Sequence, residues 1–372
     1  MSRYQINLLS PSGVYIKDLS TFSMLQWARA VNKVGVAELW LPAKLIPSQS
    51  FLAVDQILEI ERNGGILNET AYFLRFVEYY QQQDGAEIVH LLGYDLNYLL
   101  DSKIIAYAAG SSQGDKSDYA DDMMKEYVDE NLVNPTDTDR TTPNLTVAGD
   151  LGLGPSIDMA MARDNVLRAL QDIAEVARDR GTYLAFDVVR VSRNNYQFRT
   201  YTGQRGQDHT QGGSVGLRLI GPQYGNLKNA DIVLFDRRDE RNVAYAGGQG
   251  VGSDREVEEV ENTTRSQASQ YNRREVWVDA RNIEPGNTAA LQDKGYQALE
   301  KNKPVQTLTG DLVDTRGFRY GVHYGFGDLV PATAFGYTTN CHIDKMSAVV
   351  KPALISGFGQ SETITTKLEG VI

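Results

Sequence analysis

The chain has 372 residues, a length that accommodates roughly two or three domains. Hydrophobic residues make up 41% of it, and its formal net charge of −11 argues against non-specific binding to nucleic acid or an anionic membrane. The single cysteine, Cys341, excludes an intrachain disulfide and a cysteine-based zinc site. No window approaches about 18 uncharged apolar residues, so no membrane span is predicted.

Roughly the first hundred residues are predicted to be mostly β, because short alternating apolar runs are separated by turn residues. This spacing is typical of an antiparallel barrel or sandwich. The segment Ser20–Val31 is compatible with either a helix or an irregular strand. The predicted strands are Tyr4–Leu8, Val14–Ile16, Ala37–Leu41, Val54–Ile60, Tyr72–Tyr80 and Glu87–Leu92.

The pattern becomes helical after a small, polar stretch at 108–116, which we interpret as a boundary. Apolar residues at helical spacing over 119–132 predict a helix with Asp118 as its N-cap. An exposed loop is predicted at 134–144. The strongest helical pattern follows, with Gly181 as the residue after its end. Its apolar stripe consists of Val166, Leu167, Leu170, Ile173, Ala174 and Ala177.

A hairpin is predicted next, from strands Tyr183–Val191 and Tyr196–Tyr201. The Gly- and Gln-rich segment 202–216 is expected to be a mobile loop that orders only against a neighbouring subunit or tail protein. The remainder is predicted to be β, with one helix at Thr288–Asn302. Its predicted strands are Val215–Ile220, Asp231–Phe235, Val243–Ala246, Glu256–Val260, Arg274–Val278, Tyr320–Tyr324, Leu329–Ala334, His342–Val350 and Glu362–Leu368.

The glycine cluster Gly247–Gly252 has the composition of a phosphate-binding loop. A dinucleotide site requires a helix after the glycines, so that its N-terminus meets the pyrophosphate. Here the acidic, strand-like segment 253–260 follows instead. We interpret the cluster as a turn between strands, with a nucleotide site as the alternative.

The histidines do not show the spacing of a metal centre. His342 and Asp344 would share one face of a strand, which is a weak metal pattern, and His209 stands in the polar loop beside Asp208. A structural or exposed role is the better interpretation of each. The four are His90, His209, His323 and His342.

No catalytic pattern stands out among the remaining residues. Cys341 precedes His342, but neighbours on a strand point to opposite faces and cannot easily share a proton. The acidic pairs Asp121-Asp122 and Glu258-Glu259 are interpreted as solvated surface. We therefore assign no catalytic, cofactor-binding or metal-binding residue and expect no cofactor.

Several stretches, taken in their order along the chain, resemble the tail hub proteins of long-tailed phages, the siphophage relatives of the contractile-phage baseplate hub. The likeness covers nearly the whole chain. The stretches are Tyr4–Leu8 with Gly13, Trp27 and Gly35, Leu39–Pro42, Gly93–Leu100, Gly206–Thr210, Arg274–Arg281 and Gly321–Val330.

The resemblance implies a β-rich α+β fold, with two tail-tube-like antiparallel β-barrel domains plus α+β domains. The first barrel would occupy residues 1–107, and the second would be split between 201–265 and 306–372. An α+β domain at 108–200 and a small inserted α+β domain at 266–305 would lie outside the ring.

The resemblance also implies a structural virion protein, not an enzyme, that is made in the bacterial host cytoplasm and located at the phage tail tip. Three copies with two barrels each would match the sixfold tail tube while presenting threefold symmetry below it. The implied partners are two further copies, distal tail or tail tube proteins, the tape measure protein, and tail fibre or tip proteins. Two alternatives remain: a tail-associated cell-wall or polysaccharide hydrolase, and a carbohydrate-binding receptor module that the 20 tyrosines would serve.

Such a hub would contact DNA only in transit through its exit channel. A basic wall would hold DNA and an acidic wall would let it slide, and the chain carries 48 acidic against 37 basic residues. The acidic segment 254–261 is a candidate lining of that channel. We also expect extensive subunit contacts, above the roughly 2,000 Å² of obligate interfaces.

Overall fold

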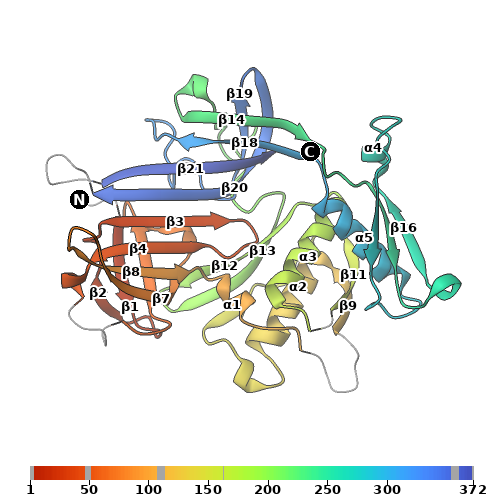
Figure 1. Cartoon of the computed structure of the whole chain (residues 1–372), viewed down its shortest axis with the longest axis horizontal. Helices are drawn as coiled ribbons and strands as arrows, with labels where there is room; N and C mark the ends of the chain where they lie inside the picture. Colours follow the sequence, from red (N-terminus) through yellow and green to blue (C-terminus); the bar gives the residue numbers. More distant parts are fainter. Residues whose placement is uncertain (1–3, 47–51, 107–113, 162, 353–359, 371–372) are drawn as a thin grey trace.

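The computed structural model describes residues 4–46, 52–106, 114–161, 163–352 and 360–370. Its largest feature is a 13-stranded sheet in which every pairing is antiparallel, built from both ends of the chain (Figure 1). The N-terminal strands are β1 (Tyr4–Leu9), β2 (Tyr15–Asp18), β3 (Met24–Ala30), β4 (Val36–Pro42), β5 (Ile57–Arg62), β6 (Gly65–Ile66), β7 (Tyr72–Gln81) and β8 (Glu87–Tyr94).

The C-terminal strands extend the same sheet. Their order continues from β20 through β21 and β18 to β14, while β19 pairs with the other edge of β20. The junction of the two halves is the pairing of β20 with β3, in which Ala348 lies opposite Trp27. These strands are β14 (Leu227–Asp236), β18 (Val305–Leu312), β19 (Leu329–Ala334), β20 (Tyr337–Pro352) and β21 (Gln360–Gly370).

Alternating burial explains why Ser20–Val31, which was compatible with two structures, contains strand β3. Leu25 and Trp27 point into the core, while their neighbours along the strand are half-buried. The core beneath the sheet contains residues of both halves, such as Leu39 and Ile343, so each half covers apolar surface of the other.

The expectation of two closed barrels is wrong for the described strands. In the first half, β3 would have to pair with β1 or β2 to close a ring, but both of its edges are occupied by β4 and β20. The sheet therefore stays open, with β2 and β14 as its two end strands.

The middle of the chain forms an α+β region beside the large sheet (Figure 1). Helix α3 ends as predicted, because Gly181 has φ +86° and the amide of Thr182 donates to the carbonyl of Ala177. The elements are α1 (Tyr98–Asp101), β9 (Gly114–Tyr119), α2 (Ala120–Val128), β10 (Leu145–Val147), β11 (Ser156–Met161), α3 (Val166–Asp179), β12 (Leu184–Ser192) and β13 (Asn195–Thr202).

Two sequence predictions in this region need correction. Asp118 does not cap a helix, because it lies in β9 and pairs with Ile157 of β11, and α2 begins only after Tyr119. Part of the predicted boundary at 108–116 lies outside the described residues, and its last three residues begin β9. The apolar spacing was nevertheless informative, since Met123, Tyr127 and their neighbours are buried.

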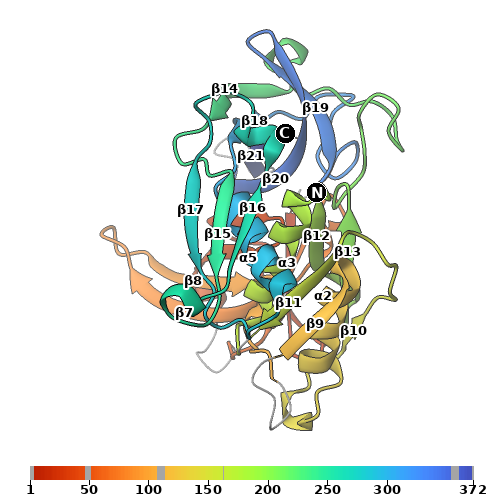
Figure 2. The same cartoon turned by 90° about the vertical axis from the view of Figure 1, so that its right-hand side faces the viewer.

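A separate three-stranded sheet lies at the side of the α+β region, with α5 between the two (Figure 2). Its elements are β15 (Val243–Gly247), β16 (Val257–Glu261), α4 (Thr263–Ser266), β17 (Glu275–Asp279) and α5 (Thr288–Lys301). The strand order is β16-β15-β17. The acidic strand β16 therefore does not belong to the large sheet, which corrects its assignment to the second barrel.

Two further predicted strands are absent from the described chain. Of Val215–Ile220, only Ile220 forms a bridge, to Ala332 of β19. Tyr320–Tyr324 is a turn closed by one bridge between its two ends. In both cases the tertiary context overrides an alternating pattern, because each segment forms only an isolated bridge and not a continuous ladder.

Candidate functional site

His90 and His342 take structural positions, each stacked on an aromatic ring. His90 stacks on Trp40, with ring centroids 4.4 Å apart, and its Nε2 lies 2.9 Å from Glu38. His342 stacks on Tyr183 at 3.9 Å. Among the residues that the structure describes, no group of three or more His, Cys, Asp or Glu side chains is placed to hold a metal ion.

The cysteine and the glycine cluster also have structural explanations. Cys341 lies in the main core, where burial raises the pKa of its thiol to about 12. A thiol with such a pKa stays protonated and is a poor nucleophile at neutral pH. The cluster Gly247–Gly252 connects the antiparallel strands β15 and β16, as predicted, and the amide of Gly248 donates to the carbonyl of Glu256.

The acidic pair Asp121-Asp122 is not the solvated surface that the sequence indicated. Asp121 is fully buried, accepts a hydrogen bond from the amide of Leu153 and forms an ion pair with Lys125 at 2.8 Å. Asp122 accepts from the amide of Gly152. The pair therefore holds the connection that precedes β11 against α2.

A buried ion cluster, which the sequence analysis missed, joins the large sheet to the α+β region. Arg29 of β3 donates to Asp95 at 2.8 Å and to Asp187 of β12 at 2.7 Å. Asp187 also accepts from Arg205, at 2.8 Å. Both guanidinium groups lie over the ring of Phe326, at 4.9 and 5.1 Å. We call these five residues the Arg29 cluster.

All members of the Arg29 cluster are buried. Its two arginines and two aspartates therefore interact as charges that water screens only weakly. Burial alone would lower the pKa of Arg29, but Asp187 and Asp95 raise it above its ordinary value. Burial raises the pKa of Asp95, against the effect of Arg29. Removing one partner would leave an uncompensated buried charge, so the cluster fixes how these segments meet.

A second ion pair joins the two halves of the large sheet directly. Arg62 at the end of β5 binds Glu362 of β21 through two hydrogen bonds, of 2.8 and 2.9 Å. Its third nitrogen donates to the carbonyl of Tyr320 at 2.6 Å. This bidentate geometry gives orientation as well as attraction.

The loop 202–216 packs on its own chain, whereas the sequence predicted contacts only from a neighbour. Within it, Arg205 and His209 are buried, at 9% and 3% exposure. The carboxylate of Asp328 accepts from the amide of Gln207 at 2.7 Å and lies 3.1 Å from Nε2 of His209. Gly206 approaches so closely that a Cβ there would overlap Asp328.

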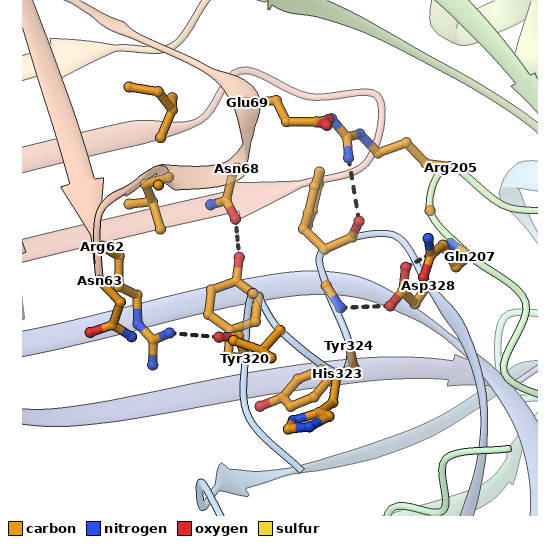
Figure 3. Close-up of a pocket in the computed structure, with 18 of the residues that line it drawn as sticks. Arg62, Asn63, Asn68, Glu69, Arg205, Gln207, Tyr320, His323, Tyr324 and Asp328 are labelled. Carbon is orange, nitrogen blue, oxygen red and sulfur yellow. Dashed lines mark hydrogen bonds and ion pairs between the residues drawn. The ribbon is translucent and has the colours of Figure 1, made fainter. Parts of the chain in front are cut away.

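A cleft of about 690 Å³ lies between the Arg29 cluster and the ion pair of Arg62 with Glu362 (Figure 3). Three separate segments line it: the turn and short 3₁₀ helix at 62–69, the end of β13 with the following loop at 199–207, and the loop at 320–328 that precedes β19. The cleft thus sits where the two halves of the large sheet meet the α+β region.

Exposed apolar side chains lie at two places on the large sheet, the end strand β14 and the β19–β20 hairpin. Val233 and Phe235 lie on the end strand β14, 36% and 70% exposed. Phe335 stands at the tip of the β19–β20 hairpin with φ +52°, next to the exposed Tyr337. The turn itself accounts for this backbone, because a two-residue hairpin turn of type I′ requires left-handed conformations at both central residues, and Gly336 has φ +84°.

None of the helices in the described part of the chain has the length and apolarity needed to cross a membrane. No curated protein matches the chain. Solved structures do, at low identity and over nearly the whole chain. A tail protein from Neisseria meningitidis MC58 aligns with a TM-score of 0.59 and 14% identity, covering 98% of this chain and 96% of that one.

Two further solved structures have a similar fold over nearly the whole chain. The 43 kDa tail protein of prophage MuSo2 from Shewanella oneidensis gives a TM-score of 0.57 and 13% identity, covering 98% of both chains. The prophage tail protein gp18 from Listeria monocytogenes EGD-e gives 0.54 and 11%, covering 98% of this chain and 94% of that one. The fold is therefore one found in prophage tail proteins.

The family follows from the sequence itself. The family model for the Siphovirus ReqiPepy6 Gp37-like protein matches residues 5–353. The chain belongs to this family, and the resemblance to siphophage tail proteins that the sequence indicated is confirmed.

Proposed function

We propose that this chain is a structural, non-enzymatic subunit of a phage tail tip or baseplate, and that three copies form a hub at the distal end of the tail tube. The observation that carries the proposal is the agreement of the whole fold with three tail proteins, two of them from prophages, each over 98% of this chain. Agreement over the full length is more informative than a shared domain, since it includes both halves of the large sheet and the α+β region between them.

In this proposal the two halves of the large sheet serve as two tube-like units, so that three copies supply six. The first unit is 1–107, and the second is 201–265 with 306–372. The domains 108–200 and 266–305 lie outside the ring. The strand pairing changes one boundary, because β15 and β16 pair with β17 and so belong with the insert.

The open ends of the sheet support assembly. Among the described strands, β14 pairs only with β18 and β2 only with β1, which leaves one side of each without a strand partner. Natural proteins cover or charge such edges to avoid uncontrolled pairing. The apolar Val233 and Phe235 on β14 are instead suited to a stable contact, and we expect interfaces above roughly 2,000 Å² per pair of subunits.

The partners of such a hub are distal tail or tail tube proteins, the tape measure protein, and tail fibre or tip proteins, in the virion. DNA would meet it only in passage through the exit channel, and the net charge of −11 favours passage over retention. With β16 outside the large sheet, the acidic lining would have to come from other residues.

The test is the mass of the purified full-length chain in solution, by native mass spectrometry, with negative-stain images of the particle. We expect three times the mass of one chain and a threefold ring. A monomer at micromolar concentration, both alone and with a co-expressed distal tail protein, would contradict the proposal.

A further inference from the structure

Trp277 of β17 is an exposed aromatic side chain on the outer face of the three-stranded sheet. Of the three tryptophans in the chain, Trp27 is buried and Trp40 half-buried, whereas Trp277 is 52% exposed. Its strand neighbours Val276 and Val278 pack on a small core that includes α5. Because successive side chains of a strand point to opposite faces, Trp277 faces away from α5. Figure 1 shows this sheet at the edge of the molecule, beyond α5.

The indole ring of Trp277 is held in place although it is exposed. The guanidinium carbon of Arg255 lies over the ring, 4.9 Å from its centroid. Arg255 is itself fixed, because it donates to the carbonyls of Gly247 and Gly248, each at 3.0 Å, and to Asp279 at 2.9 Å. A Cβ at Gly247 would overlap both the indole and Arg255, so the glycine makes room for this arrangement. One face of the ring is thus covered by Arg255, and a ligand on the other face does not have to order the side chain.

Side chains that form hydrogen bonds stand around the ring. Glu275 and Asp279 lie two residues before and after Trp277 on the same face of β17, each about 6.6 Å away along the strand. Tyr245 of β15 is the cross-strand partner of Trp277, and neighbouring strands are about 5 Å apart. The hydroxyl of Tyr245 accepts from Arg273 at 3.0 Å, which leaves its own proton to donate. The hydroxyl groups around one sugar ring can span these distances.

The charges of this face neutralise one another. Arg273 contacts three carboxylates, at 2.7, 2.9 and 3.3 Å, and Asp279 is contacted by two guanidinium groups, at 2.9 and 2.6 Å. Every charged side chain of the face therefore has a partner within the chain, and none is left over for a phosphate, a carboxylate or an ammonium group. Their outer lone pairs and protons remain accessible to the hydroxyl groups of a neutral ligand. The charged residues are Glu259, Glu261, Glu275 and Asp279, with Arg255, Arg273 and Arg281.

The size of the face argues for a small ligand and against a protein. The strands β15, β16 and β17 have five residues each, so the face measures about 17 by 14 Å, or about 240 Å². Stable protein interfaces cover about 800 Å² on each partner. A single planar ring on Trp277, by contrast, fits within the face.

We propose that the outer face of the β16-β15-β17 sheet binds a neutral sugar ring of a bacterial surface glycan. The C–H face of the sugar would stack on the free face of the indole, where dispersion and the ring quadrupole attract it. Its hydroxyl groups would bond to the carboxylates of Asp279 and Glu275 and to the hydroxyl of Tyr245. Arg255 already places a cation over the ring, which disfavours a second, cationic ligand.

The experiment is a titration of the full-length, ¹⁵N-labelled chain, followed by the indole N–H signals of its three tryptophans. The probes are the methyl glycosides of glucose, galactose, mannose and N-acetylglucosamine, with methyl glucuronide as an anionic and choline as a cationic counterpart. We expect at least one neutral glycoside to shift the signal that is missing in Trp277→Phe. The signals of Trp27 and Trp40 should stay in place.

Two variants test the stacked geometry through saturation-transfer difference signals on the sugar. Trp277→Ala should weaken binding at least about tenfold, as for other rings stacked on an aromatic side chain. Gly247→Ala keeps the indole but displaces it, and should weaken binding as well. The matched control is Tyr271→Ala, at an aromatic residue that is 85% exposed between α4 and β17. It should bind as the parent does, within about twofold.

Three results would overturn the proposal: no neutral glycoside shifts the Trp277 signal, Trp277→Ala or Gly247→Ala binds unchanged, or a charged probe binds more tightly than every neutral one. Circular dichroism of each variant shows that its fold is retained. The mass of the particle is measured on the same samples. Because the sugar site lies within one chain, its failure leaves the hub proposal standing, and a monomeric chain that binds the sugar would contradict only the hub.

Discussion

Arg29 shows what one residue contributes to this molecule. Replacing it by methionine keeps much of the side-chain volume but leaves Asp95 and Asp187 facing each other in a buried site. We expect Arg29→Met to lose about 3–5 kcal/mol of unfolding free energy, the usual cost of breaking a buried ion pair on one side. Urea denaturation followed by circular dichroism measures this loss.

The control for that variant is Arg75→Met, which removes an ion pair with Asp55 whose side chains are 35% and 51% exposed. Exposed pairs contribute about 0–1 kcal/mol, so this change should be small. Equal losses in the two variants would show that the Arg29 cluster does not fix the arrangement of the fold.

Glu59 gives the chain a defined sensitivity to acid. Burial would raise the pKa of its carboxyl, but hydrogen bonds from Arg193, Arg190 and Asn7 outweigh this and lower the pKa to about 2 from an ordinary value of 4.5. Because the folded value is the lower one, Glu59 stabilises the fold above pH 4.5, and that stabilisation is lost as the pH falls towards 2.

The corresponding variant is Glu59→Gln. We expect it to lose about 2 kcal/mol at pH 7, in line with hydrogen bonds to a charged group, and to lose less than the parent on acidification from pH 4.5 to 2. Thermal unfolding across that pH range measures both effects. Glu61→Gln, on the same face of β5 but partly exposed, serves as the control and should leave the acid dependence intact.

At the scale of elements, the loop 202–216 is where packing replaces the expected mobility. The amides of Gly206 and His209 donate to the carbonyls of Gly327 and Leu329, each at 2.8 Å. We expect slow hydrogen exchange at both amides in the isolated chain. Gly206→Ala would drive a Cβ into Asp328 and should cost more than about 2 kcal/mol, with faster exchange at these amides.

Gly216→Ala is the matched control in the same loop. The only atom near a Cβ there belongs to Arg218, at 3.8 Å, so its unfolding free energy and exchange should stay close to those of the parent. Fast exchange at Gly206 and His209 in the parent chain would restore the original expectation of a mobile loop.

How far the sequence could predict these elements depends on how local their causes are. The strand and helix periods identified β4, β8 and α3, because their burial alternates or repeats along the chain itself. The prediction that Asp118 caps a helix was wrong, because pairing with β11 places that residue in a strand. Asp187 and Arg29, 158 residues apart, carry no local signal, and neither does a cleft formed by three distant segments.

At the scale of the whole molecule, the decisive pairing was the least predictable one. The family resemblance implied two separate β units, whereas in the structure β3 joins β20 across more than half the chain, so that the N- and C-terminal strands form one open sheet. Such non-local pairing has no period along the sequence. It also determines that β2 and β14, rather than β3, are the strands left at the ends.

The last prediction concerns assembly through one of those ends. Replacing both Val233 and Phe235 on β14 by lysine adds two positive charges to an apolar edge, the means by which natural proteins keep such strands from pairing. Because both side chains are exposed, the monomer should keep its fold and lose little unfolding free energy. We expect the mass in solution to fall from three chains to one. Tyr271→Lys, at a residue 85% exposed in the connection between α4 and β17, should leave the proposed trimer intact. A trimer that survives both lysines would place the subunit contact elsewhere than β14, because an interface built on this edge could not bury two unpaired ammonium groups without losing most of its affinity.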